Sequence, residues 1–372
     1  MENKKILVIS TFPAPYRVKL FRILAEKYDI NLFFETGNDQ NRNREWFATV
    51  ESFPFVRLDD IGGKEKYKNA LRNIAQYKMV FIYDYWTKTQ MRLQLLCRIK
   101  KIPFVLNCDG ALPIAFAKKN IIKDCVKRFF IKDATAYMAG GENAKKYFVH
   151  YRADPQRIVV HNFSSMYKKE IKNAADICMD KKLTKASLNL PDKKIVLAVG
   201  QFIERKGFDV LIRAWADVRR EDAYLLIIGG GEMECGYKEL LKSKNITNAQ
   251  ILGYRSPEEL KKYYYVSDLF VLPTREDIWG LVINEAMAFG LPVITTTSCG
   301  AGLELIEDDK NGKLFPVDDI KSLTEALKKF LECNPDQLDD IARMNKEKIS
   351  HYSLEYMAQK HEEVIESLNA LA

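Results

Sequence analysis

The sequence lacks the cysteine spacing on which disulfide frameworks and zinc sites depend. Its seven cysteines are scattered over 372 residues, odd in number and never arranged as a Cys-x-x-Cys pair. This pattern argues for a reducing, cytosolic environment without structural zinc. The chain also has no apolar run approaching the roughly 20 residues of a membrane-spanning helix. The apolar run within residues 1–11 is too short for a signal peptide and indicates a first buried strand.

Histidine is scarce as well, with four in the whole chain. His361 is followed by two glutamates, but the second histidine of the His-Glu-x-x-His zinc motif is missing. No metal site is therefore predicted. The scarcity also gives little support to histidine acid–base chemistry in the first half of the chain.

The formal charge of +8 at pH 7 indicates either simple solubility or an anionic partner. An anionic substrate, an anionic membrane surface and nucleic acid are the alternatives. The chain shows no helix-turn-helix, zinc-finger or RNA-binding motif beside its charge. Nucleic acid is therefore the weakest of these partners, and none is predicted.

What the sequence does contain is a regular alternation of short β-branched runs and helical patterns. Such alternation predicts parallel, doubly wound sheets whose ligands gather outside the carboxyl ends of the strands. Residues 164–191 interrupt the alternation with a polar, lysine-rich stretch, which we interpret as the connection between two domains. The predicted strands lie near residues 4–11, 30–36, 79–84, 103–107, 136–141, 157–161, 194–200, 223–229, 250–254, 268–274 and 292–297, with a further short strand within residues 311–319.

Two strand ends in the first half have polar residues at the predicted binding edge. Tyr16 and Arg17 follow the first strand and are candidates for contacts with an acceptor or with phosphates, although a packed arginine at a helix start is an equal alternative. Asp109 follows the strand at 103–107. It is a candidate catalytic residue, and the alternative is an Asp-Gly turn without a chemical role.

The most informative stretch is residues 273–297, which predicts a strand end, an acidic turn, a helix and a further strand. The helix would begin at Gly280 and Leu281, where unpaired N–H groups and the helix dipole favour an anion such as a diphosphate. Glu285 would lie roughly 7.5 Å further along the axis, at about 1.5 Å per residue. That offset suits a ribose. Asp277, before the helix, would face the other side of the phosphates, where a sugar would hang.

A second candidate turn follows the strand at 194–200. Lys206 stands beside Gly207, which permits close backbone approach, and this combination is typical of a diphosphate clamp. Gly230 lies in a run of three glycines after the next strand, where a tight approach to a ligand and a simple chain turn are both possible. Tyr254 lies at another strand end.

These motifs together resemble family 4 retaining glycosyltransferases of the GT-B type. The resemblance rests on an acid, seven residues, a second acid and then the run EAMAFGLPVI. The family pattern is Glu-x7-Glu, in which the first acid binds donor-sugar hydroxyls and the second binds ribose. Asp277 stands in register with the first acid and Glu276 one position too early, while Glu285 matches the second.

The resemblance implies further roles for the second half of the chain. An arginine and a lysine hold the donor diphosphate in the family. Lys206 matches the lysine, but Gln201 stands where the arginine is expected, and Arg205 is the remaining candidate. Tyr254 lies where family members contact the base. Gly230 and the Gly280-Leu281 helix start would approach the nucleotide.

The resemblance also implies the architecture, which would be a GT-B fold with two Rossmann-like doubly wound domains that face a central cleft. We expect an acceptor-binding domain over residues 1–165 and a nucleotide-sugar domain over residues 166–350. A last helix over residues 351–372 would cross back to the first domain. The family's reaction needs neither a metal nor another cofactor.

The resulting hypothesis is a cytoplasmic, metal-independent, retaining glycosyltransferase. It would move a sugar from a nucleotide-sugar donor, most often a UDP-sugar in the family, to a glycan or lipid-linked acceptor in polysaccharide or glycoconjugate synthesis. Residues Ile114–Lys132 place apolar and lysine side chains on a helical pattern. This segment either covers the sheet or lies on an anionic inner membrane face. A nucleotide-sugar epimerase and a non-catalytic membrane- or glycan-binding scaffold are the rival interpretations.

Overall fold

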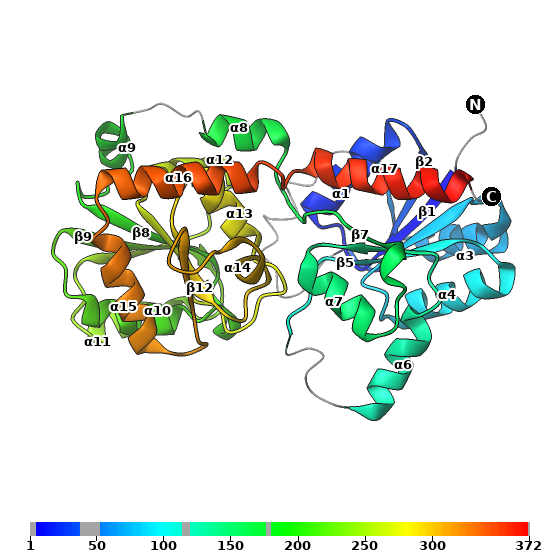
Figure 1. The fold of residues 1–372 in the computed structure, drawn as a ribbon, viewed down its shortest axis with the longest axis horizontal. Helices are drawn as coiled ribbons and strands as arrows, with labels where there is room; N and C mark the ends of the chain where they lie inside the picture. The colour runs from blue at the N-terminus through cyan, green and yellow to red at the C-terminus, as the bar shows by residue number, and fades with distance from the viewer. Residues whose placement is uncertain (1–4, 38–52, 114–119, 176–179, 371–372) are drawn as a thin grey trace. The chain divides into compact units, whose positions relative to one another are not determined.

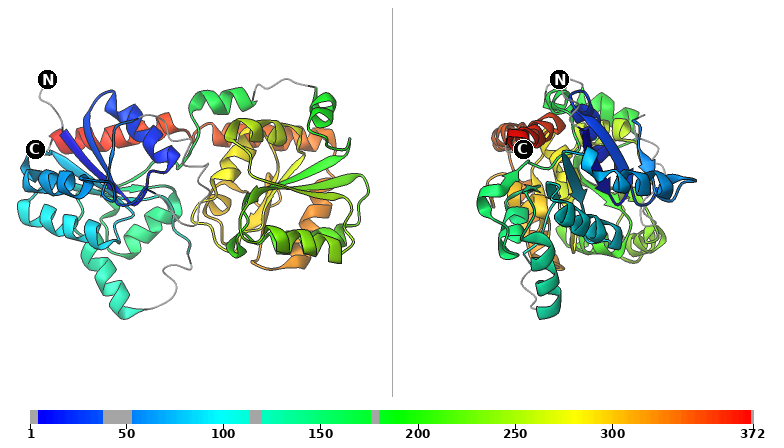
Figure 2. Two further views of the ribbon diagram at one scale, coloured as in Figure 1. Left: turned by 180° about the vertical axis from the view of Figure 1, so that it is seen from behind. Right: turned by 90° about the vertical axis from the view of Figure 1, so that its right-hand side faces the viewer.

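The structure is a computed structural model that describes residues 5–37, 53–113, 120–175 and 180–370. The chain forms two compact units. Unit 1 contains residues 1–165 and 353–372, and unit 2 contains residues 166–352. Within each unit, a parallel sheet is covered by helices on both faces (Figures 1 and 2). The predicted doubly wound α/β class is therefore confirmed.

The sheet of unit 1 has seven strands in the order β3-β2-β1-β4-β5-β6-β7. All of its pairings are parallel; Ile6, for example, pairs with Ile30 on one side and Met79 on the other. The strands are apolar because helices cover both faces of the sheet. Their bounds are β1 Lys5–Ser10, β2 Asp29–Phe34, β3 Val56–Arg57, β4 Met79–Tyr83, β5 Phe104–Cys108, β6 Ala136–Ala139 and β7 Ile158–Val160.

Helices connect these strands, and the last helix of the chain joins them. The α17 helix packs on α1 in Figure 1, with an ion pair of 2.6 Å from Lys27 to Glu362. The helices of unit 1 are α1 Pro15–Ala25, α3 Gly63–Arg72, α4 Lys88–Lys100, α6 Ile121–Ile131, α7 Glu142–His150 and α17 Leu354–Ala370, with 3-10 turns η1 Ile74–Gln76 and η2 Pro155–Arg157.

The sheet of unit 2 has six parallel strands in the order β10-β9-β8-β11-β12-β13. Its longest pairing joins β8 to β9 from Lys194↔Ala223 through Gln201↔Gly230. The strands are β8 Lys194–Gln201, β9 Ala223–Gly230, β10 Ala249–Leu252, β11 Leu269–Leu272, β12 Val293–Thr296 and β13 Gly312–Phe315. The predicted strands of the second half correspond to these elements.

The polar stretch at 164–191 is not wholly irregular. It contains two helices, of which α8 packs on α13 and α9 packs on α12. The helices of unit 2 are α8 Lys168–Ala175, α9 Lys181–Ser187, α10 Phe208–Val218, α11 Glu234–Ser243, α12 Pro257–Val266, α13 Leu281–Ala288, α14 Gly300–Leu305, α15 Ile320–Leu331 and α16 Pro335–Ile349, with the 3-10 turn η3 Glu204–Lys206.

Candidate functional site

The strand order of unit 2 reverses between β8 and β11. The chain runs outward from β8 through β9 to β10, then returns to place β11 on the other side of β8. In a parallel sheet, the turns after two such strands lie at the same edge and diverge, which leaves room for a ligand. The turns that follow β8 and β11 here are residues 202–207 and 273–280. They contain the candidates Lys206 and Asp277.

Backbone contacts hold these two turns together. The carbonyl of Arg205 accepts hydrogen bonds from the N–H of Arg275 at 2.8 Å and from Oγ1 of Thr274 at 3.1 Å. Gly207 has a φ of +68°, and a Cβ there would lie 2.1 Å from the carbonyl oxygen of Pro273. A side chain at Gly207 would therefore force the turns apart. The absence of a side chain at Gly207 therefore allows the two turns to pack against each other.

Arg275 extends the connection with its guanidinium. Its Nη1 and Nη2 donate to the two carboxylate oxygens of Asp209 at 2.9 and 2.8 Å, and its Nε lies 2.8 Å from Asp318. A third bond of 2.6 Å reaches the carbonyl of Glu204. Hydrogen bonding to Asp209 raises the pKa of Arg275 further. The sequence analysis gave Arg275 no role, because its partners lie more than 40 residues away.

Lys206 and Asp277 meet at this edge as an ion pair between Nζ and Oδ2. The side chains are 12% and 15% exposed, respectively. The backbone on either side of Asp277 is fixed, since its N–H donates to Ser298 at 2.9 Å and its carbonyl accepts from Gly300 at 3.0 Å. Two residues that the sequence placed separately around a diphosphate therefore contact each other.

The helix α13 begins at Leu281, as predicted. Gly280 is its N-cap with a φ of +98°, and a Cβ there would lie 2.9 Å from Sγ of Cys299 and 3.1 Å from a methyl group of Leu272. Only glycine fits this position without displacing neighbours. Leu281 is the first helical residue, so the first-turn N–H groups point toward the carboxyl edge of β11.

Glu285 lies on α13 and is half-buried. Its Oε2 accepts a hydrogen bond of 2.9 Å from the hydroxyl of Tyr264, which comes from α12. Burial, together with the nearby Glu285, raises the pKa of Tyr264 well above its usual value. The contact orients the carboxylate. Sequence reasoning missed Tyr264 because one of three consecutive tyrosines in a helical pattern resembles ordinary core packing.

The remaining predicted residues of unit 2 lie at the same sheet edge or beside it. Gln201 pairs in register with Gly230 at the ends of β8 and β9. A Cβ added to Gly230 would meet no atom within 4 Å, so the space beside it is open. Tyr254 follows β10 and is half-buried. The guanidinium of Arg205 donates to the backbone carbonyl of Glu276, whose side chain is exposed; this contact uses part of the charge considered for the diphosphate.

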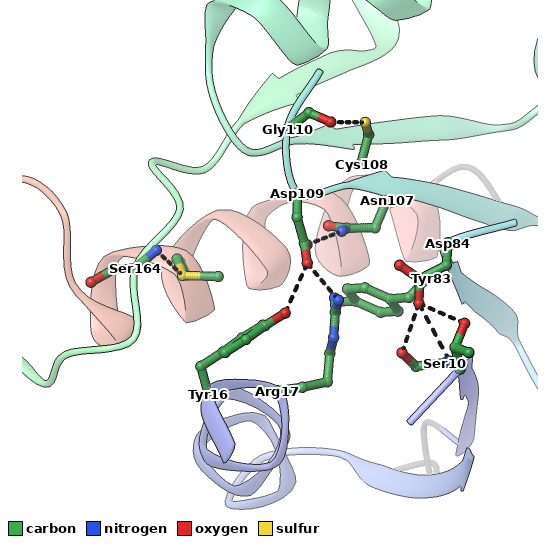
Figure 3. A network of polar contacts seen from close by, with 12 residues as sticks. Ser10, Tyr16, Arg17, Tyr83, Asp84, Asn107, Cys108, Asp109, Gly110 and Ser164 are labelled. Atoms are coloured by element: carbon green, nitrogen blue, oxygen red, sulfur yellow. Dashed lines mark hydrogen bonds and ion pairs between the residues drawn. The ribbon is translucent and has the colours of Figure 1, made fainter. Parts of the chain in front are cut away.

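Asp109 in unit 1 is held by several partners (Figure 3). Its Oδ2 lies 2.7 Å from Nη2 of Arg17 and 3.2 Å from the hydroxyl of Tyr16, and its Oδ1 accepts from Asn107 at 2.7 Å. Burial raises the pKa of Asp109, and the nearby Arg17 opposes that rise. The structure thus gives Asp109 a structural role, as the partner of a buried arginine, that the sequence did not predict.

A second acid that the sequence analysis did not select lies beside this group. Unit 1 reverses its strand order between β1 and β4, and Asp84 directly follows β4. Its Oδ2 accepts from Oγ of Ser10 at 3.2 Å and from Oγ1 of Thr11 at 3.0 Å (Figure 3). Asp84 is exposed and has a φ of +70°. Its place at the end of an apolar strand was the signal that could have identified it.

Comparison with known proteins places this geometry in a family. Residues 180–350 match the family described as glycosyl transferases group 1. These residues, which make up most of unit 2, are similar to this glycosyltransferase family, and the predicted family is confirmed over them. The matched region includes both turns and α13.

Two curated proteins illustrate the match. An uncharacterised glycosyltransferase of Haemophilus influenzae is 32% identical over 171 residues, which are 44% of this chain and 48% of that protein. A GDP-mannose-dependent alpha-(1-6)-phosphatidylinositol monomannoside mannosyltransferase of Mycolicibacterium smegmatis is 32% identical over 148 residues, which are 37% of this chain and 38% of that protein. The chain spans about half the length of these relatives or less.

Among solved structures, Anabaena Alr3699/HepE in complex with UDP-glucose aligns with a TM-score of 0.74 at 16% identity, covering 98% of this chain and 99% of that one. At this identity the likeness shows the fold alone. The predicted GT-B fold is confirmed.

The helix α6 exposes apolar side chains that a helix covering a sheet would bury. Ile121 and Ile122 are each 79% exposed, and Phe129 is 48% exposed. Lys123 is exposed, whereas Lys127 turns toward the ring of Tyr151 at 4.8 Å. The first part of the predicted segment, residues 114–119, lies outside the described residues.

Metal-ligand clusters and membrane-spanning helices are both absent from the described residues. In this part of the chain, no cluster of three or more His, Cys, Asp or Glu side chains is placed to hold a metal ion. Over the same residues, no helix combines the length and apolar character needed to cross a bilayer.

Proposed function

We propose that this protein transfers a sugar, with retention of configuration and without a metal, from a nucleotide-sugar donor to a glycan or lipid-linked acceptor. The observation that carries the proposal is the meeting of Lys206, Asp277 and the start of α13 at the strand-order reversal of unit 2. Such an edge binds nucleotides in open parallel sheets. The mannosyltransferase relative is named for phosphatidylinositol monomannoside, which supports a lipid-linked acceptor.

The proposed mechanism separates the donor into three parts. The leaving diphosphate is stabilised by Lys206 and by the positive end of the helix dipole at the start of α13, which is fixed before the reaction. Glu285, oriented by Tyr264, holds the ribose hydroxyls. Asp277, with the neighbouring Glu276, orients the donor sugar. The leaving phosphate oxygen takes the proton of the acceptor hydroxyl, so no protein nucleophile is needed.

Uridine is the proposed base, supported by the UDP-glucose complex of the Anabaena neighbour. Base contacts are assigned to the region of Gly230 and Tyr254. Gln201, in place of the family's arginine, leaves Lys206 with the larger share of the diphosphate charge. Asp109 and Asp84 lie at the corresponding edge of unit 1 and are proposed as contributors to the acceptor side.

Thermal unfolding with added nucleotides tests the donor site. UDP, GDP, ADP and their common sugar conjugates are added to the native protein and to the Glu285→Ala and Lys206→Ala variants. A ligand at 100 times its dissociation constant adds about 2.7 kcal/mol of stability, so one nucleotide should raise the Tm of the native protein and of neither variant. Glu239→Ala and Lys242→Ala, exposed positions on α11, are the matched controls and should keep the shift. If every nucleotide leaves the native Tm unchanged, the proposal is wrong.

We also propose that α6 lies on an anionic membrane surface at the inner face of the cell membrane. Its exposed isoleucines and Phe129 offer apolar area next to basic side chains, the combination that favours anionic lipid. Burying one isoleucine contributes about 1.5–3 kcal/mol. This placement would bring the protein to a lipid-linked acceptor.

Vesicle sedimentation tests the membrane contact. The native protein should bind vesicles of phosphatidylglycerol and phosphatidylcholine, and the double change Ile121→Asn/Ile122→Asn should weaken binding at least tenfold, consistent with the loss of about 1.5 kcal/mol or more per side chain. Leu183→Asn removes another exposed aliphatic side chain, 70% exposed on α9, and should leave binding unchanged. Equal losses for both variants, or equal binding to neutral vesicles, would contradict the proposal.

A further inference from the structure

The ion pair between Lys206 and Asp277 has a consequence for ligand selection. In the structure, the cation assigned to the diphosphate and the carboxylate assigned to the sugar neutralise each other. The consequence rests on the donor site proposed above. A nucleotide that uses the charge of Lys206 must first compete with Asp277 for it.

The two side chains have little freedom to separate by backbone movement. The turns that bear them are joined through the carbonyl of Arg205 and through the bonds of Arg275 to Asp209 and Asp318. Gly207 packs against Pro273 with no room for a side chain. Exchange of partners therefore takes place by rotation of the Lys206 side chain, while Asp277 stays at the edge.

Once Lys206 turns to a diphosphate, Asp277 loses its cation. Its carboxylate, 15% exposed, then lies near phosphate charge of the same sign, which is unfavourable. A partly desolvated carboxylate left without a partner costs free energy unless new donors reach it. The hydroxyl groups of a donor sugar are such donors. A free nucleoside diphosphate has none at that position.

We infer that Asp277 is a specificity-determining residue that favours the nucleotide sugar over the free nucleoside diphosphate by competing for Lys206. The substrate compensates the carboxylate with sugar hydroxyls. The product nucleotide lacks this compensation, so Lys206 returns to Asp277 and the product dissociates. The ion pair thereby limits inhibition by the product.

Isothermal titration with UDP and UDP-glucose tests the inference on four proteins: native, Asp277→Asn, Lys206→Met and the double variant. Asparagine keeps the shape of Asp277 but removes the charge that holds Lys206. We expect Asp277→Asn to bind UDP about tenfold more tightly than the native protein, the size expected when a close charge pair is removed. Binding of UDP-glucose should change less, so the preference for the sugar conjugate falls.

The double variant separates competition from simple repulsion. If Asp277 acts by holding Lys206, Asp277→Asn should give no gain in UDP affinity when Lys206 is already methionine. An equal gain in both backgrounds would mean that Asp277 only repels phosphate, and would overturn the inference. Unchanged UDP affinity in Asp277→Asn would overturn it as well, with the donor site intact. If UDP, GDP and ADP all fail to bind the native protein, the proposed function itself falls and this inference with it.

Discussion

Replacing Arg17 with methionine should lower the free energy of unfolding by about 3–5 kcal/mol, the range for breaking a buried ion pair by removing one partner. The Arg17 side chain is 4% exposed and that of Asp109 is 18% exposed, at 2.7 Å from each other. The guanidinium also lies 4.0 Å from the ring centroid of Tyr83. Methionine fills part of the volume but leaves the Asp109 carboxylate buried without its cation. Urea unfolding at pH 7.5 measures the loss.

The double variant Arg17→Met/Asp109→Leu is the control for this prediction. Removing both charges also removes the uncompensated carboxylate, so most of the lost stability should return. Arg72→Met, an exposed arginine with a surface partner in Glu65, should cost less than about 1 kcal/mol. A loss below 1 kcal/mol for Arg17→Met would show that the pair is not a structural anchor of unit 1.

The stability of the protein should fall steeply between pH 7.5 and pH 5 because of two buried histidines. Burial lowers the pKa of His361 to about 4, and burial, His361 and Arg17 lower that of His161 well below its usual value. The bonds of His361 fit the neutral ring, in which Nδ1–H donates to the carbonyl of Met357 and Nε2 accepts from the hydroxyl of Tyr83, both at 2.7 Å. Both ring nitrogens of His161 lack a hydrogen-bond partner in the described part of the chain.

Proton linkage makes the folded protein less stable as the pH falls. The unfolded chain binds a proton on each histidine near pH 6.5, whereas the folded chain does not until a lower pH. Stability is therefore complete above pH 6.5 and is lost as the pH falls toward the folded pKa. By pH 5 the loss should be about 2 kcal/mol for His361, at about 1.4 kcal/mol per pH unit. His161 adds a loss of the same sign, because its pKa is lowered too.

Urea unfolding of variants at pH 7.5 and pH 5 checks this dependence. His161→Leu removes one titrating ring and its unpaired nitrogens, so it should reduce the loss of stability between the two pH values. His351→Gln changes an exposed histidine and should leave the loss as it is. A loss that is the same in all three proteins would assign the acid sensitivity to carboxylates instead.

Local sequence patterns predicted most elements of this fold, but neither α8 and α9 in the polar stretch nor the contacts between elements. The run at 273–297 contains its own strand end, helix start and glycine, so Gly280, Leu281 and Glu285 could be placed from spacing alone. The strand order is a property of the whole sheet. The spacing of apolar residues along the chain does not predict that β11 lies beside β8.

Two of the residues that the sequence analysis missed have partners that depend on that order. Arg275 reaches Asp209 because β11 lies beside β8, and Asp84 reaches Ser10 because β4 lies beside β1. Tyr264 reaches Glu285 from a neighbouring helix. Lys206 and Asp277 were each selected, yet their contact with each other was not foreseen. Candidate residues were thus predictable one by one, and their partners were not.

Unit 1 takes its last helix from the opposite end of the chain, and this affects how the protein folds during synthesis. The α17 helix places His361 in the interior of unit 1, against Tyr83. Domains generally fold as they leave the ribosome, the N-terminal one first. Here the first unit emerges without the helix that fills its interior, while unit 2 is complete in a continuous stretch. We therefore expect unit 2 to reach its native state first and the N-terminal sheet to reach its own only after residues 354–370 have been synthesised.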